Sequence, residues 1–484
     1  MAPNVEAIEI KKATALSVGD LKDFSDVISE NCRTEVPQEP ALEVATEPVT
    51  EPESTEPEET EETTADEPET EETAETEEET TSSSIISYVS DSVSQSNALL
   101  SISNPDYSYC PGSISLSAED GYPEIDATKC VACGMCERNC HVLHPPEMKG
   151  DDPPTHVYAC YANDENVRVR SASGGAFAIL ARHCLSNGWL VCGASYGPFP
   201  EVRMRLVDSA ADLVGIIGSK YVYSDMVGVL AEVKKRLSEG RRVLFGCLPC
   251  QVSALRVFLG RLADNAVFCD LICHGTCHES LFKKYIGYLA WRYPRKRIER
   301  FCFRPDKRRF GWGAYYSATF DESIRLPLHD LWYVRYFLNL ATLRKCCYSC
   351  CSAKTPRPGD VTLGDCWQLG SNPSYARDDL RLGWSLVICN TAKGRELFNA
   401  VAPQMECREE TWDESVKHNR RLVSSDIRGV DVDVREETLR YLMNASNRKI
   451  YLTETKRCIR MILRQKCVGV AKRMLGILGM KGRT

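Results

Sequence analysis

Four closely spaced cysteines constrain this chain more than any other feature. Cys130, Cys133, Cys136 and Cys140 follow the spacing C-x2-C-x2-C-x3-C, which is typical of loops that bind a 4Fe–4S cluster. Thiolates on one tight loop can bind the same cluster, and Gly134 lets the backbone wrap around it. The alternative interpretation of such a run is a structural zinc knuckle.

The same spacing resembles the cysteine run of bacterial ferredoxins, in which the fourth cysteine binds the other of two clusters. Cys110 precedes Pro111, as a cysteine closing a second run would, but residues 98–109 contain no cysteine. We therefore predict that Cys110 completes the cluster held by the first three cysteines. Cys140 is then left over from a lost cluster, and His141 replaces the usual proline beside it.

The number and spread of the cysteines indicate a reducing compartment. The chain has 24 cysteines in 484 residues, far more dispersed than the framework of a small secreted domain. Residues 1–16 lack the apolar core of a signal peptide, and no apolar stretch reaches the length of a membrane-spanning helix. The sequence therefore predicts a cytoplasmic protein.

The charge is divided between the two ends of the chain. Residues 35–80 contain 20 acidic residues and no Lys or Arg, whereas residues 440–484 contain 12 basic residues and one acid, Glu454. The acidic segment is too polar to fold, so we expect a disordered tether rather than an interaction tail. The nearly neutral middle argues against nucleic acid as a partner.

The pattern of apolar runs predicts an α/β fold. From residue 156 onward, short apolar segments alternate with helical patterns, which indicates a mainly parallel sheet with covering helices. A small ferredoxin-like α+β module and the disordered acidic segment precede it. The expected regions are a short N-terminal segment (1–34), an acidic linker (35–97), the ferredoxin-like domain (98–153), the sheet domain (154–430) and a basic helical region (431–484).

A second set of cysteines follows predicted strands of the sheet domain. Cys250 begins a helix directly after one strand, and Cys273 ends the next. In a parallel sheet both lie at the carboxyl edge, where open α/β sheets bind ligands. With the pair Cys347 and Cys350 they supply four thiolates for a second cluster, and Cys346 or Cys351 can replace one of the pair. The alternatives are a four-thiolate zinc site and, for Cys250 alone, a small buried side chain.

Two glycine-containing turns are candidate cofactor sites. Ser173, Gly174 and Gly175 are expected to open a helix, with Ser173 as its N-cap, and such a turn suits the phosphates of a dinucleotide such as FAD. Gly218 and the residues after it, Ser-Lys-Tyr, form the second turn. The alternatives are an ordinary helix cap and a surface turn.

An ordered set of motifs resembles a known family. The motifs are VRVRSASGG (167–175), GSKY (218–221), PCQ (249–251), CHG (273–275), CYSC (347–350), LGDCW (363–367) and GWSLVICNT (383–391). They resemble the beta subunit of coenzyme F420 hydrogenases and dehydrogenases, including forms with a fused ferredoxin domain, over residues 106–403. Cys247 and Leu248 stand where Gly-Thr is usual, and Cys366 replaces an aromatic residue.

The resemblance implies cofactors and a substrate class. It implies FAD, a deazaflavin-type substrate site, and a 4Fe–4S cluster on Cys250, Cys273, Cys347 and Cys350. Its flavin contacts would come from Ser173, Gly174, Gly175, Gly218, Lys220 and Tyr221.

The expected function is electron transfer between a hydride-carrying cofactor and a redox partner, either a ferredoxin or another oxidoreductase subunit. A flavin exchanges electrons in pairs or singly, so it connects hydride donors to iron–sulfur clusters. Lys220 is our candidate for a charge near flavin or substrate, and His274 for proton transfer, with a structural strand-end histidine as the alternative. The other function classes are an electron-transfer subunit without its own substrate and a zinc-stabilised binding protein.

A basic amphipathic helix is expected over residues 452–478. Its apolar stripe comprises Ile459, Leu463, Cys467, Val470, Met474 and Leu478. Such a helix can contact an anionic membrane surface peripherally, and the alternative is a helix packed on the sheet domain or on a partner subunit.

Overall fold

The structure is a computed structural model that describes residues 114–116, 123–226, 228–313, 315–321, 324–371, 380–425 and 432–477. All of these residues lie in the second of the chain's two structural units, Ser82–Thr484. The expectations for residues 1–34 and 35–97, and for Cys110, fall outside the described residues. Within those ranges, none of the helices combines the length and apolar character needed to cross a bilayer.

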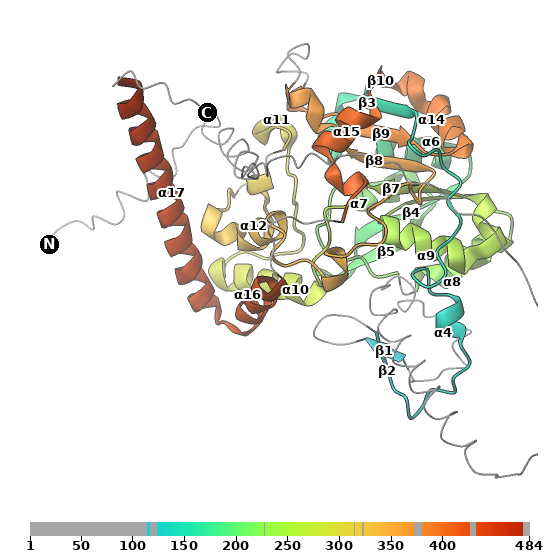
Figure 1. The fold of residues 1–484 in the computed structure, drawn as a ribbon, viewed down its shortest axis with the longest axis horizontal. Coiled ribbons are helices and arrows are strands. Elements are labelled where there is room, and N and C mark those ends of the chain that lie inside the picture. The colour runs from blue at the N-terminus through green and yellow to red at the C-terminus, as the bar shows by residue number, and fades with distance from the viewer. Residues whose placement is uncertain are drawn as a thin grey trace, which may run out of the picture. The chain divides into compact units, whose positions relative to one another are not determined.

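An eight-stranded mixed sheet is the centre of the fold (Figure 1). Its strands, in spatial order, are β10 (Met405–Glu409), β3 (His156–Ala162), β9 (Ser385–Cys389), β8 (Val361–Asp365), β7 (Ala266–Leu271), β6 (Val243–Cys247), β4 (Leu190–Tyr196) and β5 (Val202–Val207). The four strands from β8 to β4 pair in parallel, and the remaining pairs are antiparallel. The predicted α/β class with a parallel centre is confirmed, and both edges of the sheet are antiparallel.

Helices cover both faces of the sheet because successive strand residues point to opposite sides. Leu244 packs with α6 (Ala176–Ser186), α7 (Ala210–Ile216) and α14 (Ala392–Val401). Its neighbour Phe245 packs with α8 (Val229–Ser238) and α9 (Pro249–Leu259). On the same side of the sheet as Phe245, α15 (Trp412–His418) packs against β3 and β9. This two-sided burial explains why the central strands read as continuous apolar runs.

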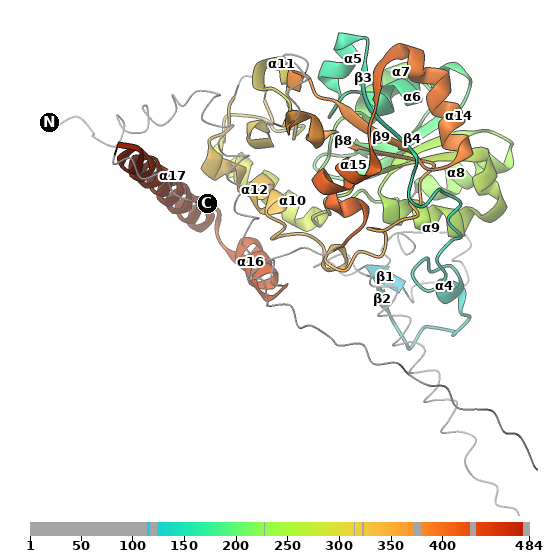
Figure 2. The same ribbon diagram turned by 45° about the horizontal axis from the view of Figure 1, so that its top comes forward.

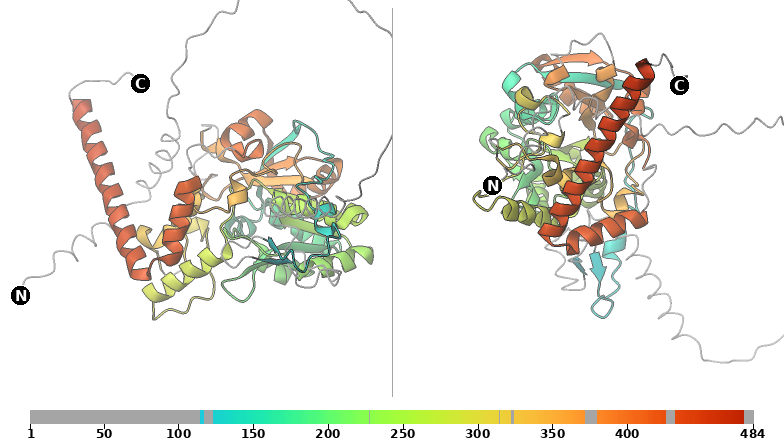
Figure 3. Two further views of the ribbon diagram at one scale, coloured as in Figure 1. Left: turned by 60° about the horizontal axis from the view of Figure 1, so that its bottom comes forward. Right: turned by 90° about the vertical axis from the view of Figure 1, so that its left-hand side faces the viewer.

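A second, helical core lies beside the sheet (Figure 2). It is built from α10 (Glu279–Arg292), α12 (Trp332–Leu338), α16 (Val432–Asn444) and α17 (Asn447–Ile477). Its interior is rich in aromatic side chains, and the buried Asp330 accepts hydrogen bonds from the hydroxyls of Tyr288 and Tyr293. Figure 3 shows α17 leaving the end of α16 as a long, separate helix.

The cysteine-rich segment before the sheet contains little regular structure. β1 (Ile114–Leu116) and β2 (Pro123–Ile125) form an antiparallel pair, and α4 (Met135–Arg138) is a single turn. Cys140 and residues beside it pack into the core under α8 and α9. These elements agree with a small α+β module, while its assignment as a ferredoxin domain stays a prediction.

Candidate functional site

Three polar side chains gather where neighbouring parallel strands end. Cys250 lies in the first turn of α9, just after β6, and Cys273 lies two residues after β7. Asp365 is the last residue of β8. Because these three strands are parallel and adjacent, their carboxyl ends meet at one edge. The sequence predicted this placement for both cysteines and missed it for Asp365.

The second cysteine set is assembled at this edge. Burial raises the pKa of the Cys250 thiol well above its usual value, and the nearby Cys350 and Cys273 raise it further. Burial and Cys350 likewise raise the pKa of Cys273 to about 11. The Cys347 thiol interacts with Cys346 and with Cys273, which also raises its pKa. Cys250, Cys273 and Cys350 therefore lie close enough to affect one another's ionisation, and Cys347 joins them through Cys273.

The group is larger than the predicted four. Cys346 and Cys351 also lie near Cys250, where either could take the place of one of the predicted pair. Among the described residues, no three His, Cys, Asp or Glu side chains are arranged to hold a single metal ion. The donor set nevertheless fits the chemistry of a 4Fe–4S cluster, which takes four thiolates from loops such as these.

Two arginines support the loops that carry these thiols. Arg421 donates hydrogen bonds to the carbonyl oxygens of Cys273 and Cys347, at 3.2 and 3.0 Å. Arg357 is fully buried, pairs with Asp270 at 3.1 Å and donates to the carbonyl oxygen of Ser352. Both guanidinium groups act to lower the pKa of Cys273 and so partly offset the rise that burial causes.

Three cysteines of the first set lie near one another. Burial raises the pKa of Cys136, and the nearby Cys130 and Cys133 raise it further. Cys140 is fully buried in the core under α8 and α9, and Cys136 packs against the same core. The adjacent His141 is also buried. Neither of its ring nitrogens has a hydrogen-bond partner among the residues that the structure describes, and burial lowers its pKa to about 4.

The loop before α6 is tightly packed. A Cβ atom on Gly174 would lie 2.2 Å from the carbonyl oxygen of Cys160 and 2.5 Å from the amide nitrogen of Ser385. Only glycine therefore fits between β3 and β9. Gly175, with φ of 101°, is the N-cap of α6. The expected cap, Ser173, is wrong, because its hydroxyl donates instead to the carbonyl oxygen of Trp384 at 2.6 Å.

Cationic side chains surround this loop. Arg304 donates to the carbonyl oxygen of Ala172 at 2.7 Å and forms a two-point ion pair with Asp365, at 2.9 and 2.6 Å. The ammonium group of Lys307 donates to the carbonyl oxygen of Ser173. Arg168 is buried nearby and donates to the carbonyl oxygen of Gly383 at 3.0 Å. Arg304 is paired with Asp365, and Lys307 and Arg168 add positive charge beside this loop.

The surroundings of Asp365 and Lys307 shift the pKa values of both side chains. Burial alone would raise the pKa of Asp365, but Arg304 and a hydrogen bond from the Trp312 indole hold it below its usual value. Burial lowers the pKa of Lys307 to about 7, and the charge of Arg304 contributes to the decrease. Lys307 therefore changes its charge near neutral pH.

A pair of stacked indoles completes this region. The rings of Trp312 and Trp367 lie 4.7 Å apart and nearly parallel, and the Trp312 indole nitrogen donates to Asp365 at 3.0 Å. Gly383 has φ of 83°, and a Cβ there would approach the Trp312 ring to 2.7 Å. Sequence reasoning passed over residues 304–312, although cations, glycine and tryptophan are concentrated there.

The second predicted turn joins this region through its tyrosine. The Tyr221 hydroxyl accepts a hydrogen bond from Arg304 at 2.8 Å, and its ring stacks on Phe337 at 4.6 Å. Gly218 has φ of 90° with open space beside it. Lys220 instead turns back to the carbonyl oxygens of its own turn, and burial lowers its pKa to about 8.

His274 is engaged within the fold. Its Nε2 atom lies 3.1 Å from the carbonyl oxygen of Phe337, and its ring contacts the Phe337 ring at 4.9 Å. Burial lowers the pKa of His274 to about 4. The ring is therefore neutral at neutral pH, and this placement supports the structural alternative over proton transfer.

The fold and these residues define an α/β protein with a thiol-rich and cationic sheet edge. Residues 157–231 match the N-terminal model of the coenzyme F420 hydrogenase/dehydrogenase beta subunit, and residues 240–415 match its C-terminal model. The chain belongs to this family, which the two matches identify over just more than half of its length. Hydrogenases and dehydrogenases are oxidoreductases, so the protein is a member of an oxidoreductase family.

Solved structures and curated proteins give two further comparisons. A chain of the F420-reducing NiFe hydrogenase complex from Methanosarcina barkeri, solved as a xenon derivative, aligns with 14% identity. The alignment covers 61% of this chain and 90% of that chain, with a TM-score of 0.36. No curated protein matches the sequence.

Proposed function

We propose that the protein is a flavin-dependent iron–sulfur oxidoreductase. It transfers electrons between a hydride-carrying cofactor of the deazaflavin F420 type and a ferredoxin-type acceptor. The main support for the proposal is one observation. The set of cysteine thiols and the cationic loop lie at the same edge of the sheet and are joined by aromatic contacts. Tyr221 and His274 both contact the ring of Phe337. Arg304 donates a hydrogen bond to Tyr221, and His274 directly follows Cys273 in the chain, so these contacts connect the cationic loop to the thiols.

The proposed flavin site is the cationic loop region. Arg304, Lys307 and Arg168 supply positive charge for the phosphates, and the Trp312–Trp367 stack offers an aromatic surface for a planar ring. A bound flavin accepts a hydride as two electrons and releases them singly. Of the predicted contacts, Gly174 shapes the loop, because strand backbone fills the space beside it. Ser173, Gly175, Gly218, Lys220 and Tyr221 remain proposed contacts.

The proposed cluster ligands come from both cysteine sets. Cys250, Cys273, Cys347 and Cys350 hold one 4Fe–4S cluster, supported by Arg421 and Arg357. The other cluster is held by the first three cysteines of the ferredoxin-like run together with Cys110. In this proposal residues 98–153 form the ferredoxin-like domain and residues 154–430 the flavin and cluster domain.

The chemistry of the thiols supports a reducing compartment and a redox partner. The structure records no disulfide between the cysteines that it describes, which suits the cytoplasm, where thiols stay reduced. The exposed part of the 130–136 loop is the proposed contact for a ferredoxin or another oxidoreductase subunit.

An anaerobic preparation tests the proposal. The protein is purified without oxygen, and its iron, sulfide and flavin are measured. Reduced F420, NADH, NADPH and reduced ferredoxin are then added in turn while the absorbance is followed. Bleaching of bound flavin by a hydride donor, with iron and sulfide present, is the expected result.

Other outcomes contradict this assignment. Iron and sulfide without flavin, with reduction only by ferredoxin, would favour an electron-transfer subunit that has no substrate of its own. Colourless protein containing zinc would instead indicate a zinc-stabilised binding protein.

A further inference from the structure

The long helix α17 is held against the helical core by a specific side. Ile450 and Glu454 are fully buried and Cys458 almost so. Glu454 accepts a hydrogen bond from the Tyr336 hydroxyl at 3.0 Å and pairs with Arg335, which also contacts the sulfur of Cys458 at 3.1 Å. A buried, paired carboxylate fixes the rotation of the helix, because turning it would leave the charge unpaired.

The opposite side of α17 carries exposed apolar side chains. Leu452, Ile459 and Leu463 are 48%, 52% and 56% exposed. Their spacing of seven and four residues places them in one line along the helix. The predicted stripe is thus correct for Ile459 and Leu463, but these residues do not pack on the protein. The side chains of the stripe beyond residue 463 lie outside those that the structure describes.

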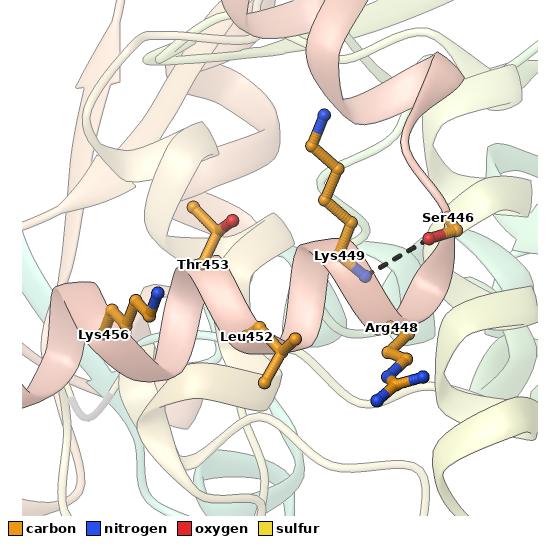
Figure 4. Close-up of a pocket in the computed structure, with 6 residues that line it drawn as sticks. All are labelled: Ser446, Arg448, Lys449, Leu452, Thr453 and Lys456. Atoms are coloured by element: carbon orange, nitrogen blue, oxygen red, sulfur yellow. Dashed lines mark hydrogen bonds between the residues drawn. The ribbon is translucent and has the colours of Figure 1, made fainter.

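Cations border this line. Arg448, Lys449 and Lys456 line an open hollow of about 340 Å³ together with Leu452, Ser446 and Thr453 (Figure 4). Exposed Arg460 lies one turn beyond. Glu454 is the only acid among residues 440–484, and Arg335 already pairs with it inside the core. The outward charge of this region is therefore positive.

We propose that this outward face of α17 docks on the surface of an anionic phospholipid membrane. A line of aliphatic residues bordered by Lys and Arg is the arrangement that places a helix at the boundary between headgroups and acyl chains. Anionic lipids supply the complementary charge, and each cation near such a surface strengthens binding by about fivefold. Among the described side chains of this line none is aromatic, unlike the centres of protein interfaces, where Trp, Tyr and Arg predominate.

Vesicle flotation of the full-length protein tests the proposal. Vesicles of phosphatidylcholine with phosphatidylserine are compared with vesicles of phosphatidylcholine alone, at low and high salt. One variant combines Leu452→Gln, Ile459→Gln and Leu463→Gln, which removes the apolar line and keeps good helix formers. A second combines Lys449→Gln and Lys456→Gln. The matched control, Lys235→Gln with Arg261→Gln, removes two exposed cations elsewhere.

We expect the wild-type protein and the matched control to float with the anionic vesicles alone, and salt to reduce the amount that floats. The apolar variant should float at least tenfold less, and the two-cation variant should bind more weakly by about 25-fold, given fivefold per cation. The proposal is overturned if the wild-type protein fails to float or binds neutral vesicles equally well. It is also overturned if the apolar variant floats like wild type, and a partner protein would then be the occupant to seek. If a variant misfolds, the dependence of wild-type flotation on salt and on anionic lipid still tests the proposal.

Discussion

The guanidinium group of Arg421 holds the backbone of Cys273 in place, with its Nε atom donating to the Cys273 carbonyl oxygen at 3.2 Å. The same group donates to the carbonyl oxygen of Cys347 at 3.0 Å. One side chain therefore joins two of the loops that carry the proposed cluster ligands. Arg421 lies outside the residues matched by the family models.

Replacing Arg421 should change the redox potential of the cluster more than its assembly. A positive charge beside a cluster favours the reduced state, so Arg421→Gln should lower the midpoint potential, by about 59 mV if the equilibrium changes tenfold. A redox titration followed by EPR measures this shift. Arg421→Lys should restore part of it. Arg420→Gln removes an exposed neighbouring cation as the control; an equal shift there would contradict the assignment.

Loss of Arg304 should release the flavin. Arg304 pairs with Asp365 at two points and binds the carbonyl oxygen of Ala172 and the hydroxyl of Tyr221. Arg304→Met removes the charge and all of these contacts, so we expect most flavin to be lost during purification. Arg304→Lys keeps the charge but not the two-point geometry, so it should retain an intermediate amount.

The matched control for this experiment is Arg308→Met. Arg308 lies on the same segment but is half exposed and pairs with Glu165 on the surface. Its flavin content should equal that of wild type. Melting curves are needed for each variant, because an uncompensated Asp365 destabilises the fold by about 3–5 kcal/mol. Full flavin content in folded Arg304→Met would refute the proposed site.

Lys307 should make anion binding dependent on pH. Because burial lowers the pKa of Lys307 to about 7, with help from Arg304, the group is charged below that pH and neutral above it. FAD affinity, measured by fluorescence from about pH 6 to about pH 9, should therefore fall as the pH rises through 7. In Lys307→Met this step should disappear.

The same pKa has an opposite consequence for folding. Lysine in the unfolded chain titrates near its ordinary pKa of 10.5, so the buried charge costs the most stability below about pH 7 and this cost declines as the pH rises from 7 to 10.5. The apoprotein should therefore become less stable relative to Lys307→Met as the pH falls from 10.5 to about 7. A step in FAD affinity that persists in Lys307→Met would show that another group titrates.

The sequence predicted where Cys250 and Cys273 lie in the fold because the signals for their placement are local. Strand ends, the C-x2-C pair and the parallel centre of the sheet suffice to place Cys250 and Cys273 at one edge. The cationic site was harder to predict, because Arg304 meets Ala172 and Asp365 across 132 and 61 residues of sequence. Contacts of that kind depend on how loops fold back over the sheet, which periodicity does not reveal.

Two local predictions failed or changed for physical reasons. Ser173 looks like a helix cap, but its hydroxyl bonds to Trp384 on a distant strand, and the positive φ of Gly175 begins the helix instead. The stripe of α17 looks like a packing surface, yet Glu454 and Arg335 turn the helix the other way. In both cases a tertiary contact outweighs a local preference.

The final prediction separates Cys110 from Cys140. Cys140 is fully buried in the core under α8 and α9, and Cys136, which packs against the same core, lies near Cys130 and Cys133. With two 4Fe–4S clusters the protein should contain about eight iron atoms. Cys140→Ala should keep all of them and lose only about 1–2 kcal/mol of stability from the small cavity. Cys110→Ala should keep about four, as should Cys250→Ala, and the double variant Cys110→Ala with Cys250→Ala almost none.

Because Cys110→Ala and Cys250→Ala affect different clusters, their EPR spectra show which cluster each variant has lost. Loss of iron in Cys140→Ala, with full iron in Cys110→Ala, would mean that the buried thiol turns toward the loop and completes the first cluster. In that case the contacts between Cys140 and the core would have to rearrange when the cluster binds. A change in melting temperature when the cluster is removed would detect this rearrangement.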